Sequence, residues 1–224
     1  MHRALASSLP TVLLLLAGCA SSGYQRASDA ADRTGSYHEE LIRLRAQVGL
    51  AIDALRALSE NPAGSPRSNP ETLQTFRLEL AGLERRAERV RTLHGKADAH
   101  AEAFLTGWST DTAALTGAEL KQGAETRRKA LEASYVELEQ GQAALDRALA
   151  ELQRELGELA LYLEHDLTAA GMGSARKTIQ AAFVDGALLQ DQIEAQAVRA
   201  QRTAIQLAPL KELAPPPPGA SRGR

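Results

Sequence analysis

The chain has 224 residues, of which 24% are charged and only 4% aromatic, and its formal net charge at pH 7 is −2. The apolar residues are mostly Ala and Leu and strand-favouring residues are scarce, so the composition favours an all-α protein. This charge balance, without a basic stripe, is not that of a nucleic-acid-binding protein, and we expect no nucleic-acid partner.

Residues 1–18 are predicted to be a secretion signal. A weakly basic start is followed by the apolar run Leu9–Ala17, which is too short to cross a bilayer as a helix. The run ends in Leu16-Ala17-Gly18-Cys19, which resembles the lipobox of bacterial lipoproteins. The resemblance implies that Cys19 is lipidated and becomes the new N-terminus. The alternative is an ordinary signal peptide that happens to contain a cysteine.

The residues that follow Cys19 indicate in which membrane a lipidated protein would be anchored. Cys19 is the only cysteine of the chain, so no disulfide competes for it. Lipoproteins with Asp directly after the cysteine are retained at the inner membrane, whereas Ala20 and Ser21 follow here. The resemblance therefore implies a lipid anchor in the outer membrane, with the body of the protein on its periplasmic face.

Residues 19–35 are predicted to be a flexible tether, because the Ser-, Ala- and Gly-rich stretch after Cys19 lacks a sustained apolar pattern. About 16 flexible residues would reach roughly 20–25 Å. Ser36 and Glu39 then have the spacing of a capping box and start a helix that ends near Ser59. Apolar residues step 4-3 along it at Tyr37, Leu41, Leu44, Val48, Ala51, Leu55 and Leu58.

A second helix is predicted to begin with Asn69 as N-cap and Pro70 at the first helical position. Gly107 and Thr110 are expected to break it, which leaves a connection around Trp108 that runs to Gly117. The seam of this helix consists of Leu73, Phe76, Leu80, Leu83, Ala87, Val90, His94, Ala97, Ala101 and Phe104.

The third predicted helix, Thr116–Asp166, organises the chain. Thr116 and Glu119 have capping-box spacing, and the helix should end at Gly171-Met172-Gly173. Its 4-3 pattern is that of a coiled-coil seam, and a polar Gln142 within it is expected to set the register. The seam residues are Leu131, Tyr135, Leu138, Gln142, Leu145, Leu149, Leu152, Leu156, Leu159 and Leu163.

Ser174 is predicted to cap a fourth helix that Pro209 ends, and residues 209–224 form a proline-rich tail. The apolar positions of this helix are Ile179, Ala182, Phe183, Leu189, Ile193, Ala197, Ala200, Ala204 and Leu207. Short connections between long helices favour antiparallel neighbours. Residues 36–208 should therefore form an elongated antiparallel bundle, a monomer or small homo-oligomer, in which the hairpin of the second and third helices projects as a stem.

Several residues carry a family resemblance. Tyr162-Leu163-Glu164-His165-Asp166-Leu167, Phe104 followed by Trp108, and the lipobox together resemble Domain of Unknown Function family 2959 (DUF2959), a family of bacterial lipoproteins. The resemblance extends from about Tyr37 to Leu207. It implies a helical protein of the cell envelope and supplies neither an activity nor a catalytic residue.

The candidate contact residues are Trp108 and, at the end of the third helix, Tyr162, His165 and Asp166. Trp108 is either a plug at one end of the bundle or an exposed contact aromatic, and we favour the plug. Tyr162, His165 and Asp166 either simply close the third helix, where a histidine in the last turn interacts favourably with the helix dipole, or form a polar recognition corner. His94 and Asp98 share a helix face, but we expect no metal site, because a polar seam residue explains His94 more simply.

No nucleophile–base pair or catalytic motif is visible, so we expect neither an enzyme nor a cofactor. The leading hypothesis is an outer-membrane-anchored lipoprotein that acts through an unidentified envelope protein partner, as a scaffold or envelope-maintenance factor. The alternative is a binding module, or chaperone-like holder, for peptidoglycan or client envelope proteins. That alternative would require an exposed apolar or aromatic groove along the bundle.

Overall fold

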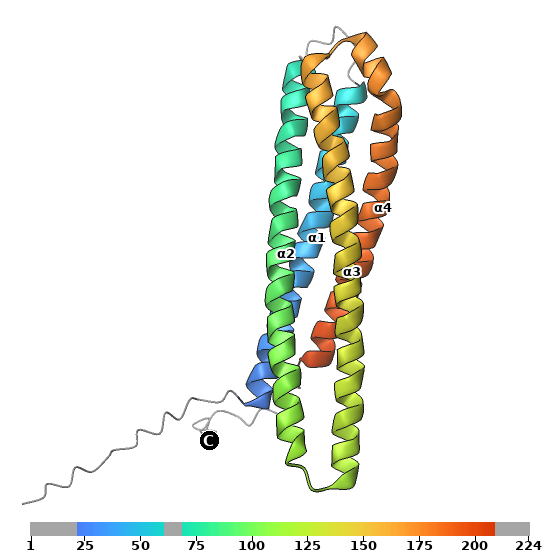
Figure 1. Cartoon of the computed structure of the whole chain (residues 1–224). Helices are drawn as coiled ribbons and strands as arrows, with labels where there is room; N and C mark the ends of the chain where they lie inside the picture. Colours follow the sequence, from blue (N-terminus) through green and yellow to red (C-terminus); the bar gives the residue numbers. More distant parts are fainter. Residues whose placement is uncertain (1–21, 61–68, 209–224) are drawn as a thin grey trace, which may run out of the picture.

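The computed structural model describes residues 22–60 and 69–208. Within these residues the chain forms four helices and no strand: α1 (Gly23–Glu60), α2 (Asn69–Ala113), α3 (Ala118–His165) and α4 (Ala169–Leu207). The helices lie side by side as an elongated bundle (Figure 1). The predicted all-α antiparallel bundle is therefore confirmed. Cys19 and the residues of the predicted tail lie outside the described residues.

Each helix packs against two neighbours: α1 and α3 both contact α2 and α4. Chain order thus runs around the bundle, with every neighbour antiparallel (Figure 1). The predicted seams form the core: all ten seam residues of α3 are buried, and Leu149, Leu156 and Leu163 are wholly inaccessible to solvent. The 4-3 spacing predicts these positions because it keeps one helix face toward its partners. None of the helices in the described ranges combines the length and apolar character needed to cross a membrane.

The start of α1 corrects the predicted tether. The helix begins at Gly23 rather than Ser36, and the Ser22 hydroxyl accepts a hydrogen bond from the Gln25 backbone N–H, as an N-cap does. The seam of α1 continues upstream at the same 4-3 spacing through Thr34, Ala30 and the partly buried Ala27. Small residues weaken the apolar pattern of this stretch, yet they pack closely enough against α2 to keep it helical.

The predicted break in α2 is also wrong, because the helix runs without interruption to Ala113. Gly107 lies where the Arg26 side chain of α1 crosses: a Cβ added to Gly107 would stand 2.4 Å from the Arg26 Nε. Glycine in a helix costs about 1 kcal/mol relative to alanine, and here its absent side chain makes room for a neighbouring helix. Thr110 stays in the helix and donates its hydroxyl to the Thr106 carbonyl.

The first residues of α3 and α4 are capped differently from the prediction. Gly117 precedes α3 with no side-chain cap, so the capping box predicted at Thr116 does not form. Thr168, rather than Ser174, caps α4 by accepting a hydrogen bond from the Gly171 backbone N–H. Gly171 therefore belongs to the first turn of α4, where a Cβ would stand 2.2 Å from the Asp166 carbonyl oxygen. The glycine allows a tighter turn than the sequence suggested.

The predicted stem is present. The connected ends of α2 and α3 extend past the start of α1 and past the end of α4 (Figure 1). Arg127 of α3 donates a hydrogen bond to the carbonyl of Gln206, close to the last residue of α4. The first ten residues of α3 therefore extend roughly 15 Å beyond α4. Every residue from Ala113 to Gly123 is exposed.

Candidate functional site

Trp108 lies on α2 near the stem and is half-buried. Its ring meets the Phe104 ring edge to face at 5.2 Å, and the Arg127 guanidinium lies 5.5 Å from its centroid. Phe104 belongs to a second, smaller core cluster that is separate from the main core and also contains Ala30, Ala101, Leu131, Tyr135 and Leu207. Trp108 is partly buried and packs against this cluster.

Tyr162, His165 and Asp166 lie at the opposite end of α3, where Tyr162 is 40% exposed and His165 is also exposed. The Asp166 backbone N–H donates to the Tyr162 carbonyl, and its carboxylate accepts a 2.6 Å hydrogen bond from the Thr168 hydroxyl. Asp166 therefore builds the α3–α4 turn. The structure brings these three residues to one corner but does not bring Trp108 to them, because 35 residues of helix, roughly 50 Å, separate Arg127 from Tyr162.

His94 faces the bundle interior from α2 and meets the Tyr37 ring edge to face at 5.2 Å. Burial lowers the pKa of His94, and the nearby carboxylate of Asp98 opposes that shift. Within residues 22–60 and 69–208, no group of three or more His, Cys, Asp or Glu side chains is arranged to hold a metal ion. His94 is thus part of the packing around Tyr37.

A buried polar layer surrounds Tyr37 and joins all four helices. The Tyr37 hydroxyl of α1 donates a 2.6 Å hydrogen bond to the Gln142 side-chain oxygen of α3. Gln196 of α4 donates to the same hydroxyl at 2.9 Å and to the Leu138 carbonyl at 2.8 Å. His94 covers the Tyr37 ring from α2. Burial raises the pKa of Tyr37 strongly, so the hydroxyl keeps its proton.

This layer explains the role predicted for Gln142 and adds a partner that the sequence reading missed. Buried polar groups are costly unless paired, so a layer whose members satisfy one another disfavours other axial registers of the helices. Gln196 is 1% exposed. The sequence does contain a pattern that predicts the burial of Gln196. Counting back from Leu207 in alternating steps of four and three gives Thr203, Ala200, Gln196 and Ile193, all of which are buried. An apolar-only reading selects Ala197 instead.

A second polar cluster is centred on Glu40, which the sequence reading also missed. The Glu40 side chain is fully buried between α1 and α2, with one carboxylate oxygen 2.6 Å from Arg86. The other oxygen lies 3.1 Å from Arg43 and 3.4 Å from Arg89. Burial alone would raise the pKa of Glu40, but the hydrogen bonds from Arg86 and Arg43 outweigh it and hold the pKa below its usual value.

The lowered pKa of Glu40 predicts an acid-sensitive contribution to stability. A carboxyl whose folded pKa lies below its unfolded value stabilises the fold fully above the unfolded pKa of about 4.5, and loses that effect as pH falls through the folded pKa. Glu40→Gln should lower the free energy of unfolding at pH 7 by about 1–2 kcal/mol, since the arginine partners are partly exposed. The gap from wild type, measured by urea unfolding, should close below about pH 4.5.

Glu137→Gln is the matched control for this prediction, because Glu137 is an exposed glutamate of α3. Its free energy of unfolding should lie within about 0.5 kcal/mol of that of wild type at pH 7 and at about pH 3. A gap between wild type and Glu40→Gln that is the same at pH 7 and at about pH 3 would mean that Glu40 contributes by shape rather than by charge.

An open groove of about 750 Å³ lies between α2 and α3, next to the stem. Four carboxylates line it, from Asp98 and Glu102 on α2 and from Glu132 and Glu139 on α3, together with apolar side chains such as Leu105 and Val136. The only cationic group among the lining residues is Arg128. The groove is therefore acidic, and it suits a basic or cationic segment better than an anionic one.

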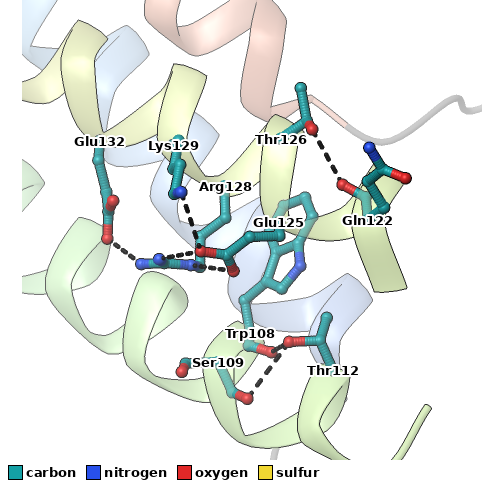
Figure 2. A network of polar contacts seen from close by, with 9 residues as sticks. All are labelled: Trp108, Ser109, Thr112, Gln122, Glu125, Thr126, Arg128, Lys129 and Glu132. Carbon is teal, nitrogen blue, oxygen red and sulfur yellow. Dashed lines mark hydrogen bonds and ion pairs between the residues drawn. The ribbon is translucent and has the colours of Figure 1, made fainter. Parts of the chain in front are cut away.

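Arg128 is held in place by its own helix. Figure 2 shows its guanidinium between the carboxylates of Glu125 and Glu132. Glu125 accepts two hydrogen bonds from it, at 2.8 and 3.1 Å, and Glu132 accepts a third. The hydrogen bonds from Arg128 lower the pKa of Glu125. This network holds charged side chains of α3 in fixed positions beside the groove.

Comparisons with known proteins found no matching family model, no matching curated protein and no matching solved structure.

Proposed function

We propose that this protein is an outer-membrane-anchored periplasmic lipoprotein that acts through protein–protein contact, as a scaffold or envelope-maintenance factor. The observation that carries the proposal is the tetrad Leu16-Ala17-Gly18-Cys19 directly after a short apolar run. It is supported by the elongated bundle that the described residues form, in which α1 begins four residues after Cys19. We further propose a relationship to the DUF2959 lipoproteins, based on Phe104, Trp108 and the segment Tyr162–Leu167.

A rod joins or spaces other components because its two ends are far apart. The 48 residues of α3 correspond to roughly 72 Å of helix. The corner at Tyr162 and His165 lies at one end of this helix, and the stem lies at the other. In this proposal the lipid anchor holds the stem end, and the Tyr162–His165 corner meets the protein partner.

The acidic groove between α2 and α3 supports a second candidate, a binding module for a client envelope protein or for peptidoglycan. Its carboxylates and the apolar Leu105 and Val136 would suit a basic amphipathic segment of a client. A photo-crosslinking residue in place of Val136 would then capture clients, and Glu102→Gln with Glu139→Gln would reduce the yield. Capture from position 162 but not from position 136 would favour the scaffold instead.

The anchor is tested by Cys19→Ser. Lipidation requires the cysteine thiol, so the variant should accumulate as an unprocessed precursor and be depleted from the outer-membrane fraction. The measurement is immunoblotting of separated membranes, with Ser21→Ala as the control that keeps the cysteine. If Cys19→Ser is processed and fractionates like wild type, the chain is not a lipoprotein.

A further inference from the structure

We infer that the tip of the α2–α3 stem, residues 113–123, rests in the lipid headgroup region beside the anchor, so that the rod stands on the membrane at two points. The inference rests on the proposed lipidation of Cys19 and adds a membrane-contact site to it. Three observations carry it: the position of the start of α1, the length of chain between that start and Cys19, and the composition of the tip.

The start of α1 lies at the stem end of the bundle. A Cβ added to Gly23 would stand 3.5 Å from the Asp111 carboxylate, two residues before the end of α2. Arg26, one turn further along α1, forms a 2.5 Å ion pair with the same carboxylate. Whatever anchors the N-terminus therefore anchors the end of the rod that carries the tip.

The chain between the anchor and the bundle is short. Cys19 and Gly23 are separated by four residue steps, which span at most about 14 Å when fully extended. The tip extends past the start of α1, the part of the bundle that lies nearest to Cys19 along the chain (Figure 1). A tether of this length keeps the tip near the bilayer, and a group that is already held at a surface needs little further affinity to bind it.

The tip differs in composition from the helix that follows it. Every residue of the tip is exposed, and its only charged residues are Glu119 and Lys121. By contrast, five of the eight residues from Glu125 to Glu132 are charged. The tip also exposes two leucines, Leu115 at 36% and Leu120 at 70%. A tip with two exposed leucines and no net charge fits the lipid interface, where the leucine side chains leave water while Glu119 and Lys121 stay among the headgroups.

The test uses single-tryptophan variants and a chemical anchor, so that it does not depend on lipidation in the cell. The mature chain, starting at Cys19, is coupled through its thiol to maleimide lipid in phosphatidylethanolamine–phosphatidylglycerol vesicles with brominated acyl chains. Trp108→Phe removes the native tryptophan, and Leu120→Trp adds one at the tip. The matched control is Leu161→Trp, which lies on the same helix at the far end and is similarly exposed, 59% against 70%.

We expect the brominated lipid to quench the emission of Leu120→Trp and to leave that of Leu161→Trp unchanged. Adding Leu115→Asp to the Leu120→Trp variant should reduce the quenching, and circular dichroism confirms that each variant is folded. Equal quenching at both positions would mean that the rod lies flat, and quenching at neither would mean that the tip stays in water. Either result overturns the inference, whereas the proposed anchor fails only if Cys19→Ser is processed and fractionates like wild type.

Discussion

Leu152→Ala should lower the melting temperature by about 4–20 °C, the largest effect that we expect from a single substitution. Leu152 is 2% exposed in the main core and lies in the unbroken part of the α3 seam, between Leu149 and Leu156. Truncating a buried leucine costs about 2–5 kcal/mol through lost transfer free energy and the residual cavity. In a chain of this size each kcal/mol shifts the melting temperature by about 2–4 °C. The change in melting temperature is measured by thermal unfolding, with circular dichroism as the signal.

Arg154→Ala is the control for Leu152→Ala, because both substitutions introduce the best helix former into the same helix. The Arg154 side chain is 66% exposed, and its ion pair with Glu158 spans one turn of helix at 2.9 Å. Such exposed pairs contribute about 0.3–0.5 kcal/mol. Similar small shifts for the two variants would show that the leucine seam is not packed, and the antiparallel bundle would have to be abandoned.

Gly141→Ala should destabilise the protein by about 1–2 kcal/mol, although alanine is the better helix former by about 1 kcal/mol. The added Cβ would stand 2.0 Å from the Gln196 side-chain oxygen and 2.8 Å from its Cδ. Gln196 cannot move away freely, because its amide donates to the Tyr37 hydroxyl and to the Leu138 carbonyl inside the bundle. Leaving such buried groups unpaired costs about 1–3 kcal/mol each. Urea unfolding at neutral pH measures the difference.

Gly157→Ala is the matched substitution, because a Cβ at Gly157 on the same helix meets nothing within 4 Å. It should raise the free energy of unfolding by up to about 1 kcal/mol. In a Gln196→Ala background, Gly141→Ala should become stabilising too, since the clash is gone. If Gly141→Ala stabilises the wild-type chain as much as Gly157→Ala does, the polar layer is not rigid enough to fix the register.

The sequence alone determined the helices and the residues that form their core. The α3 seam from Leu131 to Leu163 is buried at all ten predicted positions. In α1 the predicted seam is likewise buried from Tyr37 to Leu58. Periodicity is a local property: a residue every three or four positions returns to the same helix face, so an apolar stripe identifies that face without any knowledge of its neighbours. The length of the apolar pattern also predicted that the third helix is the longest and that its hairpin with the second helix projects as a stem.

The tertiary structure alone decided where the helices end and which polar side chains meet. Residues 23–35 are helical because Ala27 and Ala30 pack into the second core cluster and Thr34 is buried beside them, a contact that the spacing of large apolar residues does not predict. Gln196 reaches Tyr37 across 159 positions of sequence, and Arg86 likewise reaches Glu40 from another helix. Such pairs depend on the rotation and axial offset of packed helices. These are set by how all the side chains fit together, so the spacing along a single helix does not contain them.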